Sequence, residues 1–161
     1  MGIKASAKNL SSIAFSPDGK TLATAGLGGD ISLWALPAGE KIGALSGHEV
    51  AAWSLAFVHV GRFLVSLGYE GTIKFWDTES WGEARTLRPE EPGVRGLAFS
   101  PDEELLALSM EGKVQLWSVG EWAQQAELSV GTKSVSSLAF APDGRWLAVG
   151  AADKKIRVWA L

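Results

Sequence analysis

Residues 10–36 read LSSIAFSPDGKTLATAGLGGDISLWAL and contain three short apolar runs separated by two turn signals. The first run, Leu10–Phe15, precedes a Ser-Pro-Asp-Gly turn, in which Pro presets one backbone dihedral and Gly tolerates a positive φ. Thr21–Ala25 and Ile31–Leu36 are the second and third runs, and a glycine-rich segment joins them. Runs of this length with such boundaries predict β-strands joined by hairpins. Because so small a sheet with two apolar faces is unstable alone, it needs neighbours.

The same pattern occurs four times with a period of 41–42 residues. Phenylalanine ends each first run, leucine lies near the start of each second run and tryptophan lies near the end of each third run. These markers are Phe15, Phe57, Phe99 and Phe140; Leu22, Leu64, Leu106 and Leu147; and Trp34, Trp76, Trp117 and Trp159. A fourth strand is expected after each of the first three tryptophans, over Lys41–Leu45, Glu83–Leu87 and Gln124–Leu128. A period near 40–45 residues with four strands in each unit is typical of β-propeller blades. We therefore predict an all-β fold.

The repeats resemble those of the WD40 family over essentially the whole chain. The resemblance depends on LAFSPD at 97–102, LAFAPDG at 138–144, Gly47-His48 and the tryptophan that ends each third strand. It implies a WD40-type β-propeller unit over residues 1–161, with four blades of four antiparallel strands. The implied repeats are about 8–45, 46–87, 88–128 and 129–161, with residues 1–6 as the fourth strand of the closing blade. It also implies structural roles for His48 and for the recurring phenylalanines and tryptophans.

The repeats depart from the family pattern in two ways. Only Trp76-Asp77 keeps the Trp-Asp pair, and only the second repeat keeps Gly-His. The acidic turn residue six positions before each tryptophan is Glu70, Glu111 or Asp153, but the first repeat has Gly28 there. We therefore expect the family's hydrogen-bonded set of His, Ser/Thr, Asp and Trp to be incomplete in every repeat. Stability should then depend more on apolar packing between blades.

Composition limits the classes of function. The chain has 161 residues, a net charge of −3 and no cysteine, which suits one domain with a sizeable core. The slight acidity gives no electrostatic basis for binding nucleic acid or an anionic membrane. No apolar run reaches the ~18 residues of a membrane helix, and Met1–Asn9 is too polar for a secretory signal. We expect a soluble, cytoplasmic protein that binds neither nucleic acid nor membrane.

No constellation of residues predicts catalysis. His48 and His59 are the only histidines and lie in different connections, so we predict no metal site. Gly28-Gly29 precedes no helix and is interpreted as a tight turn rather than a phosphate loop. We expect no cofactor and no enzymatic activity, and interpret the chain as a protein-interaction or scaffold module. Two alternatives stay open: a propeller that binds carbohydrate or a small ligand, and a fragment or engineered half of a larger propeller that only assembles.

The resemblance implies a partner-binding face near the start of each first strand and beside the acidic turn residue. The matching positions in the second and third repeats are Trp53, Tyr69, Arg95 and Met110, and core packing is the alternative for Trp53 and Met110. Trp, Tyr and Arg dominate interface energetics. The opposite face would carry Trp81 and Trp122.

We expect the chain to act as a homodimer that closes one ring of eight blades. The resemblance implies rings of seven or eight blades, and four regular repeats are too few for such a ring. An open half ring would expose an apolar face at each end, which is uncommon on soluble monomers. In a two-fold dimer, blade 1 would pack against blade 4 of the other chain. Met1–Ser6 of one chain would then lie beside Ile156–Leu161 of the other as a fourth strand.

Overall fold

The computed structural model describes residues 2–3, 8–90, 93–132 and 134–161. They form two compact units, Met1–Glu90 and Glu91–Leu161, and every strand pairing within them is antiparallel. The all-β class and the four blades predicted from the repeats are confirmed. The arrangement of all four blades as one unit stays a prediction. Residues 1 and 4–6 of the predicted closing strand lie outside the described residues, and so that strand also stays a prediction.

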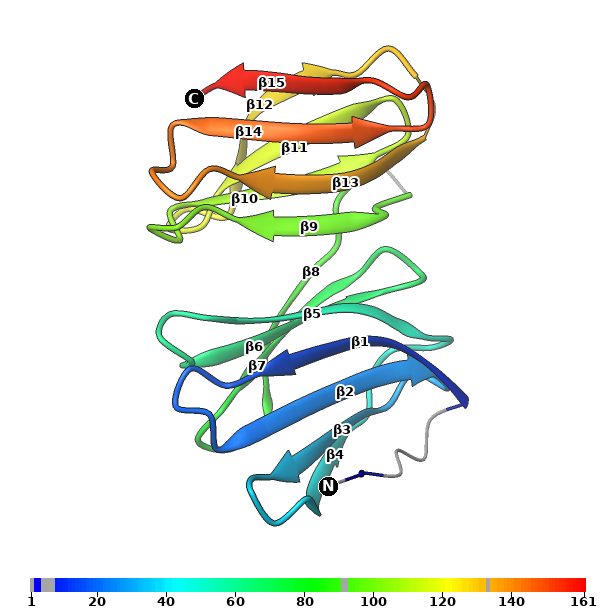
Figure 1. The fold of residues 1–161 in the computed structure, drawn as a ribbon, viewed down its shortest axis with the longest axis vertical. Coiled ribbons are helices and arrows are strands. Elements are labelled where there is room, and N and C mark those ends of the chain that lie inside the picture. Colours follow the sequence, from blue (N-terminus) through cyan, green and yellow to red (C-terminus); the bar gives the residue numbers. More distant parts are fainter. Residues whose placement is uncertain (1, 4–7, 91–92, 133) are drawn as a thin grey trace. The chain divides into compact units, whose positions relative to one another are not determined.

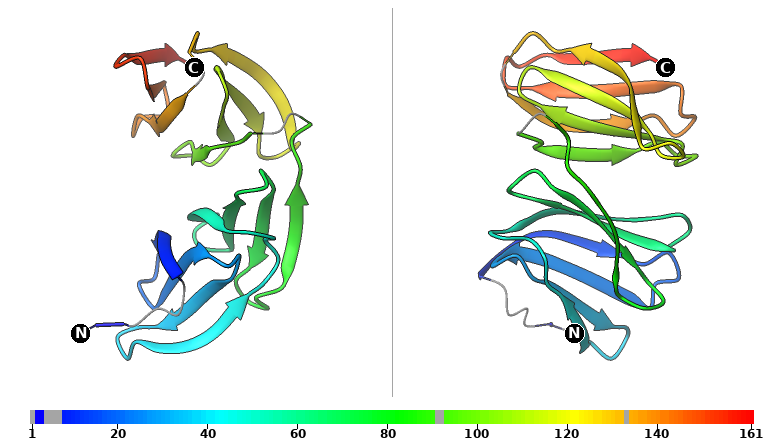
Figure 2. Two further views of the ribbon diagram at one scale, coloured as in Figure 1. Left: turned by 90° about the vertical axis from the view of Figure 1, so that its right-hand side faces the viewer. Right: turned by 180° about the vertical axis from the view of Figure 1, so that it is seen from behind.

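The first unit contains two four-stranded sheets in which each strand pairs with the next one along the chain (Figure 1). Both sheets are strongly twisted (Figure 2), as expected for strands of L-residues. The first sheet comprises β1 (Lys8–Phe15), β2 (Thr21–Leu27), β3 (Ile31–Ala35) and β4 (Glu40–Leu45), and the second comprises β5 (Ala52–Val58), β6 (Phe63–Gly68), β7 (Ile73–Asp77) and β8 (Glu83–Leu87).

Local turn chemistry sets the hairpin between β1 and β2. Ser16 Oγ donates to Asp18 Oδ1 at 2.6 Å, and the Lys20 backbone N–H donates to the same oxygen at 3.0 Å. Gly19 has φ +67°, a left-handed conformation that glycine adopts without steric penalty. The turn therefore follows from the Ser-Pro-Asp-Gly sequence itself.

The core of the first unit lies between its two sheets, where β5 contacts both β1 and β2. The first sheet contributes mostly small or branched side chains, and the second contributes larger ones. They are Ala23, Ala25, Ile31, Leu33 and Leu45 from the first sheet, with Ala52, Leu55, Leu64 and Trp76 from the second. Trp76 is only 3% exposed. One face of the first blade is thus complementary to the opposite face of the second.

The second unit contains one four-stranded and one three-stranded sheet. Its strands are β9 (Gly96–Phe99), β10 (Leu105–Met110), β11 (Lys113–Ser118) and β12 (Ala123–Ser129), then β13 (Val135–Phe140), β14 (Trp146–Ala151) and β15 (Ile156–Ala160). Ala107, Val114 and Leu116 of the first of these sheets pack against Leu147 and Val149 of the second, with Phe140 and Trp159 partly buried beside them. The packing repeats the scheme of the first unit.

Candidate functional site

A chain of hydrogen bonds crosses the second blade. Trp76 Nε1 donates to Ser66 Oγ at 2.9 Å, His48 Nε2 lies 2.7 Å from the same oxygen, and His48 Nδ1 lies 2.5 Å from Glu70 Oε1. Thr72 Oγ1 also donates to Glu70 Oε1. A Cβ at Gly68 would overlap both Glu70 Oε1 and His48 Nδ1, so glycine leaves the space for this pair.

The expectation that this set is incomplete in every repeat is wrong for the second repeat. Glu70 reaches His48 in place of the family's aspartate, and the chain from Trp76 to Glu70 is continuous. Among the described residues of the first blade, this set is represented by the bond from Trp34 Nε1 to Thr24 Oγ1, at 2.9 Å. His48 is buried and therefore acts within the fold rather than at a surface site.

Glu70 makes the stability of the first unit depend on pH. Burial raises the pKa of its carboxyl, but hydrogen bonds from Thr72 and His48 outweigh that effect and hold the pKa below its ordinary value of 4.5. A carboxylate with a lowered pKa contributes stability above the pKa of the unfolded chain, and this contribution disappears as the pH falls through the folded pKa. Acid should therefore weaken the His48–Glu70 contact.

We expect Glu70→Gln to reduce the loss of stability as the pH falls below the ordinary carboxyl pKa of 4.5, since glutamine has no carboxyl proton to bind. The measurement is urea unfolding at several pH values, with Glu79→Gln as the control. Glu79 is an exposed carboxylate that pairs with Arg62, and its replacement leaves the contact between His48 and Glu70 in place. Equal pH dependence in the parent and Glu70→Gln would contradict this role for Glu70.

An apolar surface patch gathers where β1, β2 and β5 meet, and we call it the Trp53 patch. The rings of Trp53 and Tyr69 meet edge to face with centroids 6.0 Å apart, and these residues are 47% and 57% exposed. Beside them is a hollow of about 460 Å³ whose lining includes Leu10, Leu27 and Trp53. The patch comprises Leu10, Leu27, Val50, Trp53 and Tyr69, all of them exposed.

Backbone irregularities bring these side chains to the surface. Ala52 pairs with Gly68 and Ser54 with Leu67, so Trp53 is the extra residue of a β-bulge. Bulges re-aim side chains and often lie beside functional sites. The backbone N–H of Tyr69 donates to Ala51 O at 2.9 Å, which holds the turn of Tyr69 beside β5. The structure therefore brings together Trp53 and Tyr69, as the repeat pattern suggested.

The other two residues of the predicted site belong to the second unit. Arg95 is exposed immediately before β9. The prediction that Met110 contributes to a binding surface is wrong, since its side chain is only 2% exposed. In the third repeat Trp117 follows Leu106 by eleven positions, whereas in the second Trp76 follows Leu64 by twelve. The shorter hairpin keeps Met110 within β10, paired with Lys113. Sequence matching also missed Leu10 and Val50, which carry no repeat marker.

Two further apolar faces are exposed, one in each unit. On β1, Ile13 and Phe15 point away from the core of the first unit and are exposed. On β15, Ile156 and Val158 are exposed, while the alternating residues Arg157 and Trp159 are partly buried. We call these the β1 face and the β15 face.

Comparison with known proteins identifies the class of fold. The WD domain, G-beta repeat family matches residues 3–35, 39–77, 82–118 and 122–160. The chain therefore belongs to the WD40 repeat family.

Three relatives illustrate the range of similar proteins. Periodic tryptophan protein 2 homolog of Dictyostelium discoideum is 31% identical over 62% of this chain and 11% of its own length. Protein HIR1 of Cryptococcus neoformans is 29% identical over 59% of this chain and 12% of its own length. Meiotic recombination protein rec14 of Schizosaccharomyces pombe is 33% identical over 60% of this chain and 32% of its own length. The similarity thus spans a third or less of these relatives.

The described residues include no group of three or more His, Cys, Asp or Glu side chains placed to hold a metal ion. Within the same ranges, no helix has the length and hydropathy needed to span a membrane.

Proposed function

We propose that the chain is a non-catalytic protein-interaction module that binds a partner protein at the Trp53 patch. The observation that carries this proposal is the exposed pair of Trp53 and Tyr69 beside a hollow of about 460 Å³. Exposed aromatic anchors next to a cavity are the usual centres of binding energy in protein interfaces. The exposed side chains of the patch are apolar, so the fitting partner is a segment that inserts a leucine or aromatic side chain.

The patch can be tested with a displayed library of random peptides selected against the whole chain. We expect selected peptides to carry apolar anchors, and Trp53→Ala or Tyr69→Ala to weaken them by about thirtyfold, as hot-spot truncations do. Trp146→Ala is the matched control because Trp146 is also exposed but lies in the second unit. Peptides that bind all variants equally would place the interaction elsewhere, and loss at Trp81 or Trp122 would favour the opposite face.

We also propose that two copies close one ring of eight blades through the β1 face and the β15 face. The β15 face has the residue types that the first blade presents to the second. Ala139, Ala148, Ile156 and Val158 occupy the repeat positions of Ala14, Ala23, Ile31 and Leu33, and these last four pack in or against the core of the first unit.

The β1 face has the complementary residue types. Ile13 and Phe15 occupy the positions of Leu55 and Phe57, and Leu55 is buried in the contact between the first two blades while Phe57 packs against it. The observed packing of blade 1 on blade 2 therefore supports packing of blade 4 of one copy on blade 1 of another. Two such contacts, related by a two-fold axis, would cover both faces.

Light scattering of the whole chain tests this assembly. We expect a mass of twice the 17.1 kDa of one chain. A monomeric mass would overturn the dimer and would favour an unclosed chain, or a chain that closes on itself. The location of the protein in the cytoplasm stays a prediction.

A further inference from the structure

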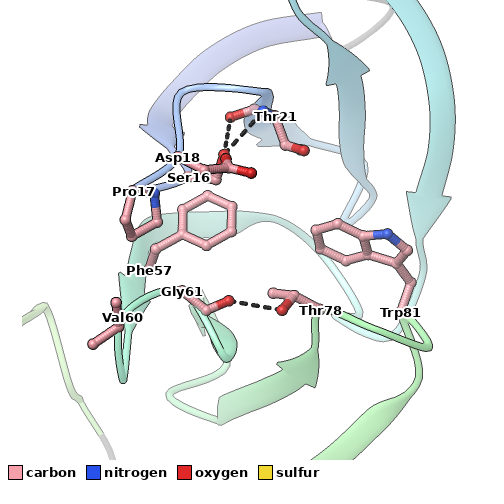
Figure 3. Close-up of a pocket in the computed structure, with 9 residues that line it drawn as sticks. All are labelled: Ser16, Pro17, Asp18, Thr21, Phe57, Val60, Gly61, Thr78 and Trp81. Atoms are coloured by element: carbon pink, nitrogen blue, oxygen red, sulfur yellow. Dashed lines mark hydrogen bonds between the residues drawn. The ribbon is translucent and has the colours of Figure 1, made fainter.

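A second hollow of about 210 Å³ lies in the first unit, apart from the Trp53 patch. Its lining combines aromatic rings with one carboxylate. Figure 3 shows the Phe57 ring beneath the turn of Ser16 and Asp18, with the Trp81 indole beside it. Pro17 and Val60 complete the apolar part of the lining. We call this hollow the Trp81 pocket.

Three turns from two blades build the Trp81 pocket. Thr78 Oγ1 donates to Gly61 O at 2.7 Å and ties the turn after β7 to the turn after β5 (Figure 3). A Cβ at Gly61 would lie 2.9 Å from Pro17 Cδ, so the turn after β5 also touches the turn after β1. The walls are therefore held by contacts between turns rather than by one loop alone.

The polar wall of the Trp81 pocket is acidic. Hydrogen bonds from Ser16 and from the Lys20 backbone hold the pKa of Asp18 below its ordinary value, so this carboxylate is ionised at neutral pH. Both bonds use Oδ1. The positive charge of Lys20 further lowers the pKa of Asp18. Arg62, at the neighbouring turn, forms ion pairs with Asp77 and Glu79. The carboxylate and the two rings make the pocket complementary to a cation.

The rim of the pocket holds an unusual turn. His59 and Val60 have φ of +51° and +53°, a left-handed conformation that disfavours side chains and is a genuine outlier for a β-branched residue. Val60 is also 93% exposed, so its side chain gains nothing from burial in the folded chain. Exposed and strained residues at a pocket rim are typical of sites that contact a ligand.

We propose that the Trp81 pocket binds the arginine or lysine side chain of an extended peptide segment. The aliphatic stem lies against the rings of Phe57 and Trp81, and the cationic group faces Asp18. Aromatic faces attract cations, and long basic side chains pack their stems on apolar surfaces while the charge stays near water. Val60 contacts an apolar side chain next to the basic one. This site is independent of the Trp53 patch and of ring closure.

The test titrates the whole ¹⁵N-labelled chain with three probes and follows the indole N–H signal of Trp81 by NMR. The probes are Nα-acetyl-arginine methylamide, Nα-acetyl-lysine methylamide and the uncharged Nα-acetyl-norleucine methylamide. The Trp81→Phe variant assigns the signal. We expect the two cationic probes to bind about fivefold more tightly than norleucine, since all three stems can lie on the rings but only the cationic groups are attracted by the Asp18 carboxylate.

Asp18→Asn should remove the preference for the cationic probes. Asp102→Asn is the matched control, because Ser100 Oγ donates to Asp102 at 2.5 Å and the Glu104 backbone donates at 3.1 Å in the same kind of turn, which belongs to the second unit. Phe57→Leu should weaken all three probes. Equal binding of cationic and norleucine probes, an unshifted Trp81 signal, or an unchanged preference in Asp18→Asn would each overturn the proposal.

Discussion

Replacement of Trp76 by alanine is expected to lower the free energy of unfolding of the first unit by about 3–5 kcal/mol, as for other large-to-small core changes. The Trp76 side chain is 3% exposed and packs in the core between the first two blades. Its removal leaves a cavity within this core cluster, because neighbouring strands are fixed by their backbone pairing and cannot collapse fully. It also removes the hydrogen bond to Ser66 Oγ.

Urea unfolding followed by circular dichroism measures this loss. Trp146→Ala is the control, since the same residue type on β14 is exposed and its removal creates no internal cavity. We expect the control to change the unfolding free energy by less than about 0.5 kcal/mol, as for surface substitutions. A similarly small change for Trp76→Ala would contradict the contact between the first two blades.

Replacement of Val158 by aspartate is expected to convert the proposed dimer into a monomer. Val158 corresponds to Leu33, which is buried between the first two blades, so an aspartate there would be buried by ring closure. An uncompensated buried charge costs several kcal/mol. A two-fold ring contains two such contacts, and one substitution affects both. Ile13→Asp should have the same effect from the opposite side of the contact.

Val60→Asp is the control for both interface variants. It introduces the same aspartate at an exposed turn, outside the β1 face and the β15 face, and should leave the mass unchanged. The masses are measured by light scattering at one protein concentration. A dimer that persists in both Val158→Asp and Ile13→Asp would exclude the β1 face and the β15 face as the contact between the two copies.

The strands follow from local sequence because their signals are local. Alternation along a strand and the Ser-Pro-Asp-Gly turn depend on residues that are neighbours in the chain. The predicted fourth strand Glu83–Leu87 is observed with the same limits, and the predicted strand at Lys41–Leu45 begins one residue earlier. The period of the phenylalanine, leucine and tryptophan markers was sufficient to predict the number of blades.

The candidate sites were only partly predictable. Trp53 and Tyr69 could be selected because their places in the repeat match, and their rings lie together. The residue type of Met110 did not distinguish it from Trp53 and Tyr69. Its burial depends on a hairpin that is one residue shorter in the third repeat than in the second. The Trp81 pocket combines turns that are up to 65 residues apart, from Ser16 to Trp81, and no spacing rule connects them.

The sequence by itself determined the class of fold, the four repeats and the absence of cysteine chemistry, because periodic side chains and turn residues act over a few positions. Only the tertiary structure decided which departures from the repeat pattern change hydrogen bonding or side-chain exposure. Glu70 completes the hydrogen-bond chain because its longer side chain still reaches His48. Trp53 is exposed because a bulge turns it outward. Both outcomes depend on the path of the backbone through space and on which strands lie next to each other, which residue types alone do not specify.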